Sequence, residues 1–101
     1  MRLEAPHFIE FDNLVKMEND AIEMGLQYTE LREQNKAFYQ GYILKAKKWG
    51  PGIMQYENGS TYEGEWKDDM REGRGKHCFE NGDVYEGRWE RNEMSGYGVL
   101  V

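Results

Sequence analysis

The stretch that decides the fold is residues 62–66, which read YEGEW and recur as YEGRW in residues 85–89. In both copies, aromatic or small residues alternate with charged ones, and this alternation is typical of a β-strand with one buried face. The interval from Tyr62 to Tyr85 is the repeat period, and a weaker copy begins one period earlier at Tyr39, with Ile43 at the tryptophan position. Self-similarity at a fixed period of this length indicates stacked structural repeats.

The rest of each copy predicts a second strand and two turns. A turn at Asp68-Asp69 reverses the chain, and residues 73–79 form the returning strand, with Gly73, Gly75, His77 and Phe79 on one face. Asn81-Gly82 favours a type I′ hairpin turn, because that turn needs a positive φ at both central residues. Glycines inside strands mark the close approach of another group. We therefore expect three glycines to make room for tyrosine and tryptophan rings of neighbouring strands: Gly64, Gly73 and Gly75.

These residues resemble the MORN repeat (membrane occupation and recognition nexus), whose unit carries Tyr-x-Gly-x-Trp, then Gly-x-Gly, then Asn/Asp-Gly. Three copies are predicted at residues 39–61, 62–84 and 85–101. The resemblance implies a solenoid of antiparallel β-hairpins without enzymatic activity. It also implies protein contacts, oligomerisation or phospholipid binding, as in cytoskeletal and ciliary scaffolds and in junctional membrane proteins.

The chain before the repeats is predicted to be a helical arm. From Asp12 to Lys36 there is no proline and one glycine, and apolar residues follow helical spacing loosely. Asp12 is a candidate N-cap, Gly25 a candidate stop, and Thr29 a candidate cap for a second helix over Glu30–Ala37. One long helix and two short ones both fit this pattern. We therefore expect an α+β fold, with an arm at residues 1–36 and an antiparallel repeat array at 37–101.

Composition excludes several functional classes. The 101 residues carry a net charge of −6, and both halves are acidic, which disfavours nucleic-acid binding. The start of the chain lacks the apolar region of a signal peptide, and no apolar run approaches the length of a membrane span. His77 and the single Cys78 are adjacent on a predicted strand, so they point to opposite faces and form no dyad. We expect no catalytic residues, no cofactor and no metal site.

The predicted partner contacts lie on the sheet and its last strand. Residues 96–101 end in three apolar residues, and an exposed apolar edge promotes association. This edge joins a partner strand, continues into further chain, or frays. Partner contact is predicted through the strand edge, the sheet face or the arm, with a homo-oligomer as one form. The candidate residues are Tyr62, Trp66, Tyr85, Trp89, Tyr97, Val99 and Val101. For the repeat aromatics, a purely structural role fits the pattern equally well.

One basic cluster supports an alternative. Lys45, Lys47 and Lys48 lie beside Trp49 in the degenerate first copy, and such a cluster contacts anionic lipid at about 1 kcal/mol per cation. The competing interpretation is a solvated turn. The sequence thus predicts a non-catalytic scaffold or accessory subunit, with a peripheral membrane module as the alternative. From the resemblance we expect an intracellular location, in a cytoskeletal or ciliary assembly, with a mitochondrial or other organellar complex as the competitor.

Overall fold

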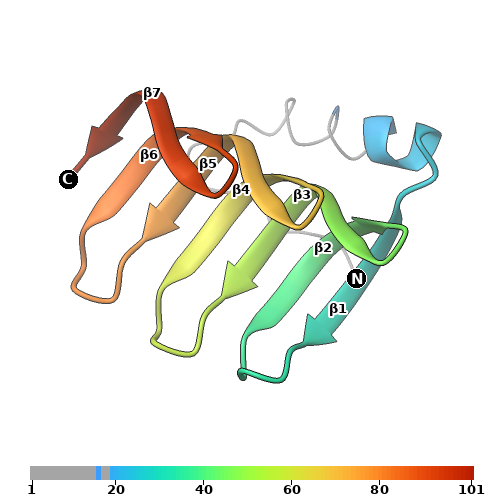
Figure 1. Ribbon diagram of the computed structural model, residues 1–101, viewed down its shortest axis with the longest axis horizontal. Helices are drawn as coiled ribbons and strands as arrows, with labels where there is room; N and C mark the ends of the chain where they lie inside the picture. The colour runs from blue at the N-terminus through green and yellow to red at the C-terminus, as the bar shows by residue number, and fades with distance from the viewer. Residues whose placement is uncertain (1–15, 17–18) are drawn as a thin grey trace.

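The computed structural model describes residue 16 and residues 19–101, and in this range the protein is mostly β, with one short helix (Figure 1). Seven strands form one open antiparallel sheet in which every strand pairs with its neighbours in chain order. They are β1 (Gln27–Arg32), β2 (Phe38–Leu44), β3 (Lys47–Gln55), β4 (Thr61–Lys67), β5 (Met70–Cys78), β6 (Val84–Glu90) and β7 (Glu93–Leu100). The predicted repeat array is confirmed, but an α+β class overstates the helical content.

The second predicted helix is wrong. Thr29 lies within β1, and Glu30–Ala37 comprises the end of β1 and the turn into β2. This turn has the hydrogen bonds of the later repeat junctions: Glu33 N–H donates to the Ala37 carbonyl, as Tyr56 donates to Ser60 and Phe79 to Asp83. β1 is therefore the second strand of a further, degenerate repeat that precedes Tyr39. Pairing with β2 supplies its backbone hydrogen bonds, so a weak helical pattern is overridden.

The first part of the predicted arm ends as expected at Gly25. Residues 19–23 are helical, and Gly25 has a φ of 81°. Gly25 N–H donates to the Ile22 carbonyl and Leu26 N–H to the Ala21 carbonyl, which is the Schellman pattern that closes a helix. Ala21 and Leu26 are buried with Tyr42 in a small cluster that anchors the helix to the sheet. The predicted cap at Asp12 lies outside the described residues.

The type I′ turn predicted at Asn81-Gly82 occurs instead at Asp68-Asp69, where the sequence predicted a turn of no particular type. Asp68 and Asp69 both have positive φ values, 54° and 68°, which is the type I′ signature that we expected at Asn81-Gly82. At Asn81-Gly82 only the glycine has a positive φ, 96°. There Gly82 N–H donates to the Phe79 carbonyl, so the loop is a type I turn followed by a left-handed glycine. Asn81 contributes through its side-chain oxygen, which accepts a hydrogen bond from Asp83 N–H at 2.9 Å.

A row of glycines crosses the sheet beneath the repeat tyrosines. Six glycines are paired in register from strand to strand: Gly41, Gly52, Gly64, Gly75, Gly87 and Gly98. A Cβ on Gly64 would lie 2.6 Å from Gly75 Cα and 2.7 Å from the Tyr62 hydroxyl, so no side chain fits. The ring of Tyr62 thus packs directly against Gly64 and Gly75, as predicted. Gly73 differs, because its Cβ would meet the Glu65 carboxylate and its φ is 84°.

Tryptophan and tyrosine rings alternate above the glycine row and form the core. We call these rings the ladder; in spatial order they are Tyr39, Trp66, Tyr62, Trp89 and Tyr85. Tyr62 makes edge-to-face contacts with Trp66 and Trp89, at centroid distances of 5.1 and 5.3 Å. Tyr39 contacts Trp66 and Tyr85 contacts Trp89 in the same geometry. Such pairs contribute about 0.5–1.5 kcal/mol each beyond the area that they bury. Because each tryptophan bridges two repeats, the core is continuous along the array.

Candidate functional site

Each tyrosine and tryptophan of the ladder also donates a hydrogen bond to a backbone carbonyl. The Tyr62 hydroxyl donates to the Glu65 carbonyl at 2.9 Å, at the point where the β4–β5 register shifts. The indole Nε1 of Trp66 donates to the Gly52 carbonyl, and that of Trp89 to the Gly75 carbonyl, both at 3.2 Å. Buried polar groups are costly unless bonded, so these contacts fix the rings in one position.

The type I′ turns tie each repeat to the preceding one. Asp69 Oδ1 accepts a hydrogen bond from Lys48 N–H at 2.7 Å, and Asp69 N–H donates to the Lys48 carbonyl. One repeat later, Asn92 makes the same pair of bonds with Arg71. Lys48 and Arg71 occupy equivalent positions one period apart, and both cations lie over aromatic rings of the ladder. The aromatic face of the sheet therefore carries two aligned cations, Lys48 and Arg71, which we call the cation row.

Most of the predicted partner contacts are core residues in this structure. Tyr62 is fully buried, and the exposed fractions of Trp66, Tyr85 and Trp89 are at most 7%. These four side chains leave little surface for another molecule, so the structural interpretation of the repeat aromatics fits them. Tyr97, Val99 and Val101 are different: they lie on and after β7 and are exposed, Tyr97 to 94%.

The third repeat lacks one of the ring contacts that the second repeat has. Tyr62 contacts two indole rings, whereas the indole ring against Tyr85 in the described chain is that of Trp89. The Gly98 carbonyl is equivalent to those of Gly52 and Gly75, yet no indole in residues 16 and 19–101 donates to it. Apolar side chains on and just after β7 are exposed: Met94, Val99, Leu100 and Val101. β7 therefore ends the sheet with an edge that is unpaired within the described residues.

The basic cluster of the first copy is largely neutralised. Lys47 Nζ lies 2.9 Å from Asp68 Oδ1, and this contact raises the Lys47 pKa. Lys48 forms ion pairs with Glu33 and Asp69. Trp49 packs partly buried against the cluster around the helix. Lys45 is exposed in its turn, so the four predicted lipid contacts do not form a free cationic patch.

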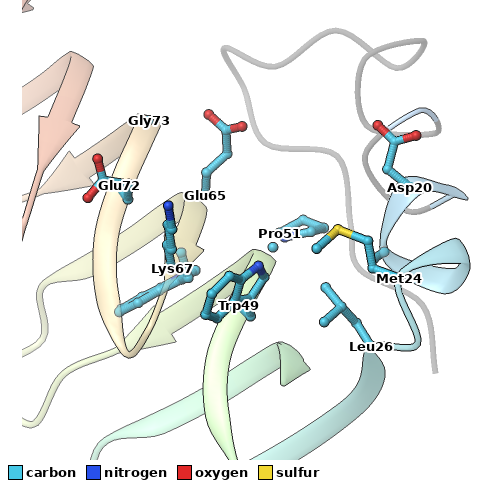
Figure 2. Close-up of a pocket in the computed structure, with 12 residues that line it drawn as sticks. Asp20, Met24, Leu26, Trp49, Pro51, Glu65, Lys67, Glu72 and Gly73 are labelled. Carbon is cyan, nitrogen blue, oxygen red and sulfur yellow. The ribbon is translucent and has the colours of Figure 1, made fainter. Parts of the chain in front are cut away.

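An open cleft of about 270 Å³ lies between the short helix and the sheet (Figure 2). Its floor is apolar, with the Met24 side chain extended toward Pro51 above Trp49 and Leu26. The carboxylates of Asp20, Glu65 and Glu72 stand at separate places around it, as Figure 2 shows. These carboxylates lie apart from one another, whereas a catalytic or metal site would need them close together.

A second, open cavity of about 380 Å³ lies on the aromatic face between repeats one and two. We call it the Arg71 cavity; its lining comprises Tyr56, Asn58, Ser60, Arg71, His77, Phe79 and Glu80. His77 is buried, and burial together with the nearby Arg71 cation lowers its pKa to about 4. A neutral His77 can accept a hydrogen bond, and its Nδ1 lies 3.3 Å from Arg71 Nη1. His77 is thus a packed residue rather than a general base.

In the described part of the chain there is no group of three or more metal-ligating side chains, and no helix is long and apolar enough to cross a bilayer. A comparison with protein families matches the MORN repeat at residues 39–61, 62–84 and 85–101. The chain belongs to the MORN repeat family. MORN repeats are generally non-catalytic modules for protein or membrane interaction. The comparison with curated proteins found no match.

Sequence reasoning missed β1 and the cation row of this MORN array. The signal for β1 was Asn35, which lies one period before Asn58 and whose Oδ1 accepts a hydrogen bond from Ala37 N–H at 3.0 Å. The signal for the cation row was the same spacing between Lys48 and Arg71. Both signals were hard to recognise because glycine and tryptophan dominate the repeat pattern. The turn before β2 is also disguised, because Lys36 stands at the position of the turn glycine.

Proposed function

We propose that this MORN repeat protein is a non-catalytic accessory subunit that joins a larger assembly through the edge of β7. The observation that carries the proposal is the incomplete third repeat, in which Tyr85 has one indole neighbour and the Gly98 carbonyl has no indole donor among the described residues. Edge strands with apolar side chains associate readily with another strand. The exposure of Val99 and Leu100, each 63%, supports this interface.

The repeat geometry indicates what such a partner supplies. Its strand runs antiparallel to β7 and carries a tryptophan that packs on Tyr85 and donates to the Gly98 carbonyl, as Trp89 does one repeat earlier. The three tryptophans of this chain, Trp49, Trp66 and Trp89, lie on β3, β4 and β6, which are paired on both sides. A second copy therefore cannot offer an unpaired tryptophan strand, which favours a different protein as partner. Membership of the family supports an intracellular scaffold role, with cytoskeletal or ciliary assemblies first and organellar complexes next.

The test places a photo-crosslinking amino acid at Tyr97 in the cells that express the protein. We expect one dominant protein adduct that disappears when Val99→Lys is added, since a lysine on this edge opposes strand pairing. The same probe at Lys45, in a turn of the first repeat, is the matched control and should give no such adduct. An adduct unaffected by Val99→Lys, or one that contains only a second copy, would refute the proposed partner.

The membrane alternative is measured in parallel. Sedimentation with vesicles that contain anionic phospholipid should leave the protein in the supernatant, because Lys47 and Lys48 are already paired with carboxylates. Retention at low salt that is lost in a Lys45→Glu variant would favour the peripheral membrane module instead. Imaging of a fluorescently tagged chain tests the proposed cytoskeletal or ciliary location.

A further inference from the structure

The Arg71 cavity differs from its counterpart one repeat earlier in one charged group. In the first repeat, the cation Lys48 forms an ion pair with the Glu33 carboxylate. The residue one period after Glu33 is Tyr56, and the residue one period after Lys48 is Arg71. The second repeat thus keeps the cation and replaces the carboxylate by a phenol.

The contacts of Arg71 confirm that its charge is not neutralised within the described chain. Its Nε donates to Asn92 Oδ1 at 3.2 Å and its Nη2 to the Asn92 carbonyl at 2.8 Å. Its Nη1 lies against the neutral His77 ring. No carboxylate oxygen of residues 16 and 19–101 forms an ion pair with it, although Lys48 has two such partners. Since a guanidinium has five N–H donors, two remain available.

The walls of the cavity suit the side chain that would complete the pair. Tyr56 and Phe79 are partly buried apolar rings that can cover a methylene stem, and Asn58 adds a polar group. We infer that the Arg71 cavity binds a carboxylate from a partner protein, an aspartate or glutamate side chain that pairs with Arg71 as Glu33 pairs with Lys48. The inference adds a contact on the aromatic face and does not depend on the β7 interface of the proposed function.

The direct test is a titration of isotope-labelled protein, observed by nuclear magnetic resonance. The probe is the blocked peptide acetyl-Gly-Glu-Gly-amide, and the control is the same peptide with glutamine. We expect saturable shifts of the Arg71 Nε–H and Ser60 amide signals, with a dissociation constant on the order of millimolar, as befits one partly exposed ion pair. The glutamine peptide should bind about fivefold more weakly, because it lacks the charge that forms the ion pair.

Variants assign the binding to the cavity. Followed at the Ser60 amide, Arg71→Gln should abolish the shift, whereas Arg71→Lys should retain it with less than about tenfold loss of affinity, since a lysine fills the equivalent place in repeat one. Glu80→Gln removes the carboxylate that also lines the cavity and should leave binding unchanged or tighter. Val99→Lys should not alter the titration, so failure here and failure at β7 are distinguishable.

An internal ligand gives a second readout that does not need a peptide. Tyr56→Glu rebuilds the Glu33 arrangement, and Tyr56→Gln is its matched control. We expect the unfolding equilibrium constant of Tyr56→Glu to be about fivefold smaller than that of Tyr56→Gln, with no difference between them when Arg71→Gln is added. Tyr56→Glu should also lose the peptide titration, because its own carboxylate occupies the cavity.

Three outcomes would overturn the inference. The first is equal binding of the glutamate and glutamine peptides. The second is equal binding by the wild-type chain and the Arg71→Gln variant. The third is a response of the same signals to inorganic phosphate or to anionic vesicles but not to the glutamate peptide, which would assign the cavity to phosphate groups or to a membrane surface.

Discussion

Replacing Gly75 by alanine tests the central packing argument of the fold. All three heavy atoms nearest to an added Cβ belong to the Tyr62 side chain: Oη, Cε1 and Cζ. That ring cannot move aside freely, because Trp66 and Trp89 contact its two sides and its hydroxyl is bonded to the Glu65 carbonyl. One methyl group therefore has to displace the centre of the ladder.

The expected loss follows from the contacts that a displaced ring gives up. Overpacking a core by one carbon destabilises by about 1–3 kcal/mol. Loss of the Tyr62 hydroxyl bond adds about 1 kcal/mol, and weakening of two edge-to-face pairs adds about 1 kcal/mol more. We expect Gly75→Ala to lower the free energy of unfolding by about 4 kcal/mol, a large share of the roughly 5–15 kcal/mol typical of small domains.

The assay is urea unfolding, monitored by tryptophan fluorescence, with Gly82→Ala as control. Gly82 has a φ of 96° and open space around its Cβ position, so this variant measures backbone strain without a clash, about 1–2 kcal/mol. In a Tyr62→Leu background, Gly75→Ala should cost less than about 1 kcal/mol, because the obstructing ring is gone. A loss below about 1.5 kcal/mol in the wild type, or an undiminished loss in Tyr62→Leu, would refute the proposed clash.

Three further predictions concern other parts of the array. Because the pKa of His77 is lowered to about 4 from 6.5 by burial and by Arg71, its stabilising contribution should be complete above pH 6.5 and be lost as the pH falls toward 4. Thermal unfolding as a function of pH should show this loss, about 3 kcal/mol at most, and His77→Met should remove it. Asp69→Ala should cost about 2 kcal/mol, since it deletes the bond to Lys48 and leaves alanine at a positive φ, whereas Asp69→Asn should stay within about 0.5 kcal/mol. Trp89→Phe should lower the free energy of unfolding by about 2–3 kcal/mol in the urea assay, because it opens a gap and leaves the Gly75 carbonyl without its indole donor. A variant as stable as the wild type would show that this hydrogen bond contributes nothing measurable.

The aromatic and glycine positions carried most of the predictable structure. Residues 62–66 show period-two alternation, and their recurrence predicts hairpins that stack, because a hairpin with one apolar face needs a neighbour to cover it. Gly64 was recognisable as a packing position for the same reason. The type I′ prediction at Asn81-Gly82 was wrong, although the Asn-Gly pair is a strong local signal for that turn. The type I′ turn lies at Asp68-Asp69, where it is supported by the contact of Asp69 with the preceding repeat.

The sequence by itself determined the repeat unit, its fixed period and the residues that form the aromatic core, since these follow from alternation and spacing. The tertiary structure decided the secondary structure of the segments whose sequence pattern was weak. Residues 27–32 became a strand because β2 satisfies their backbone hydrogen bonds, although their local pattern favoured a helix. The tertiary structure also decided which repeat aromatics are buried, and it left Arg71 over a cavity without a carboxylate partner in the described chain. Burial and charge pairing depend on neighbours across strands, which no local pattern reports.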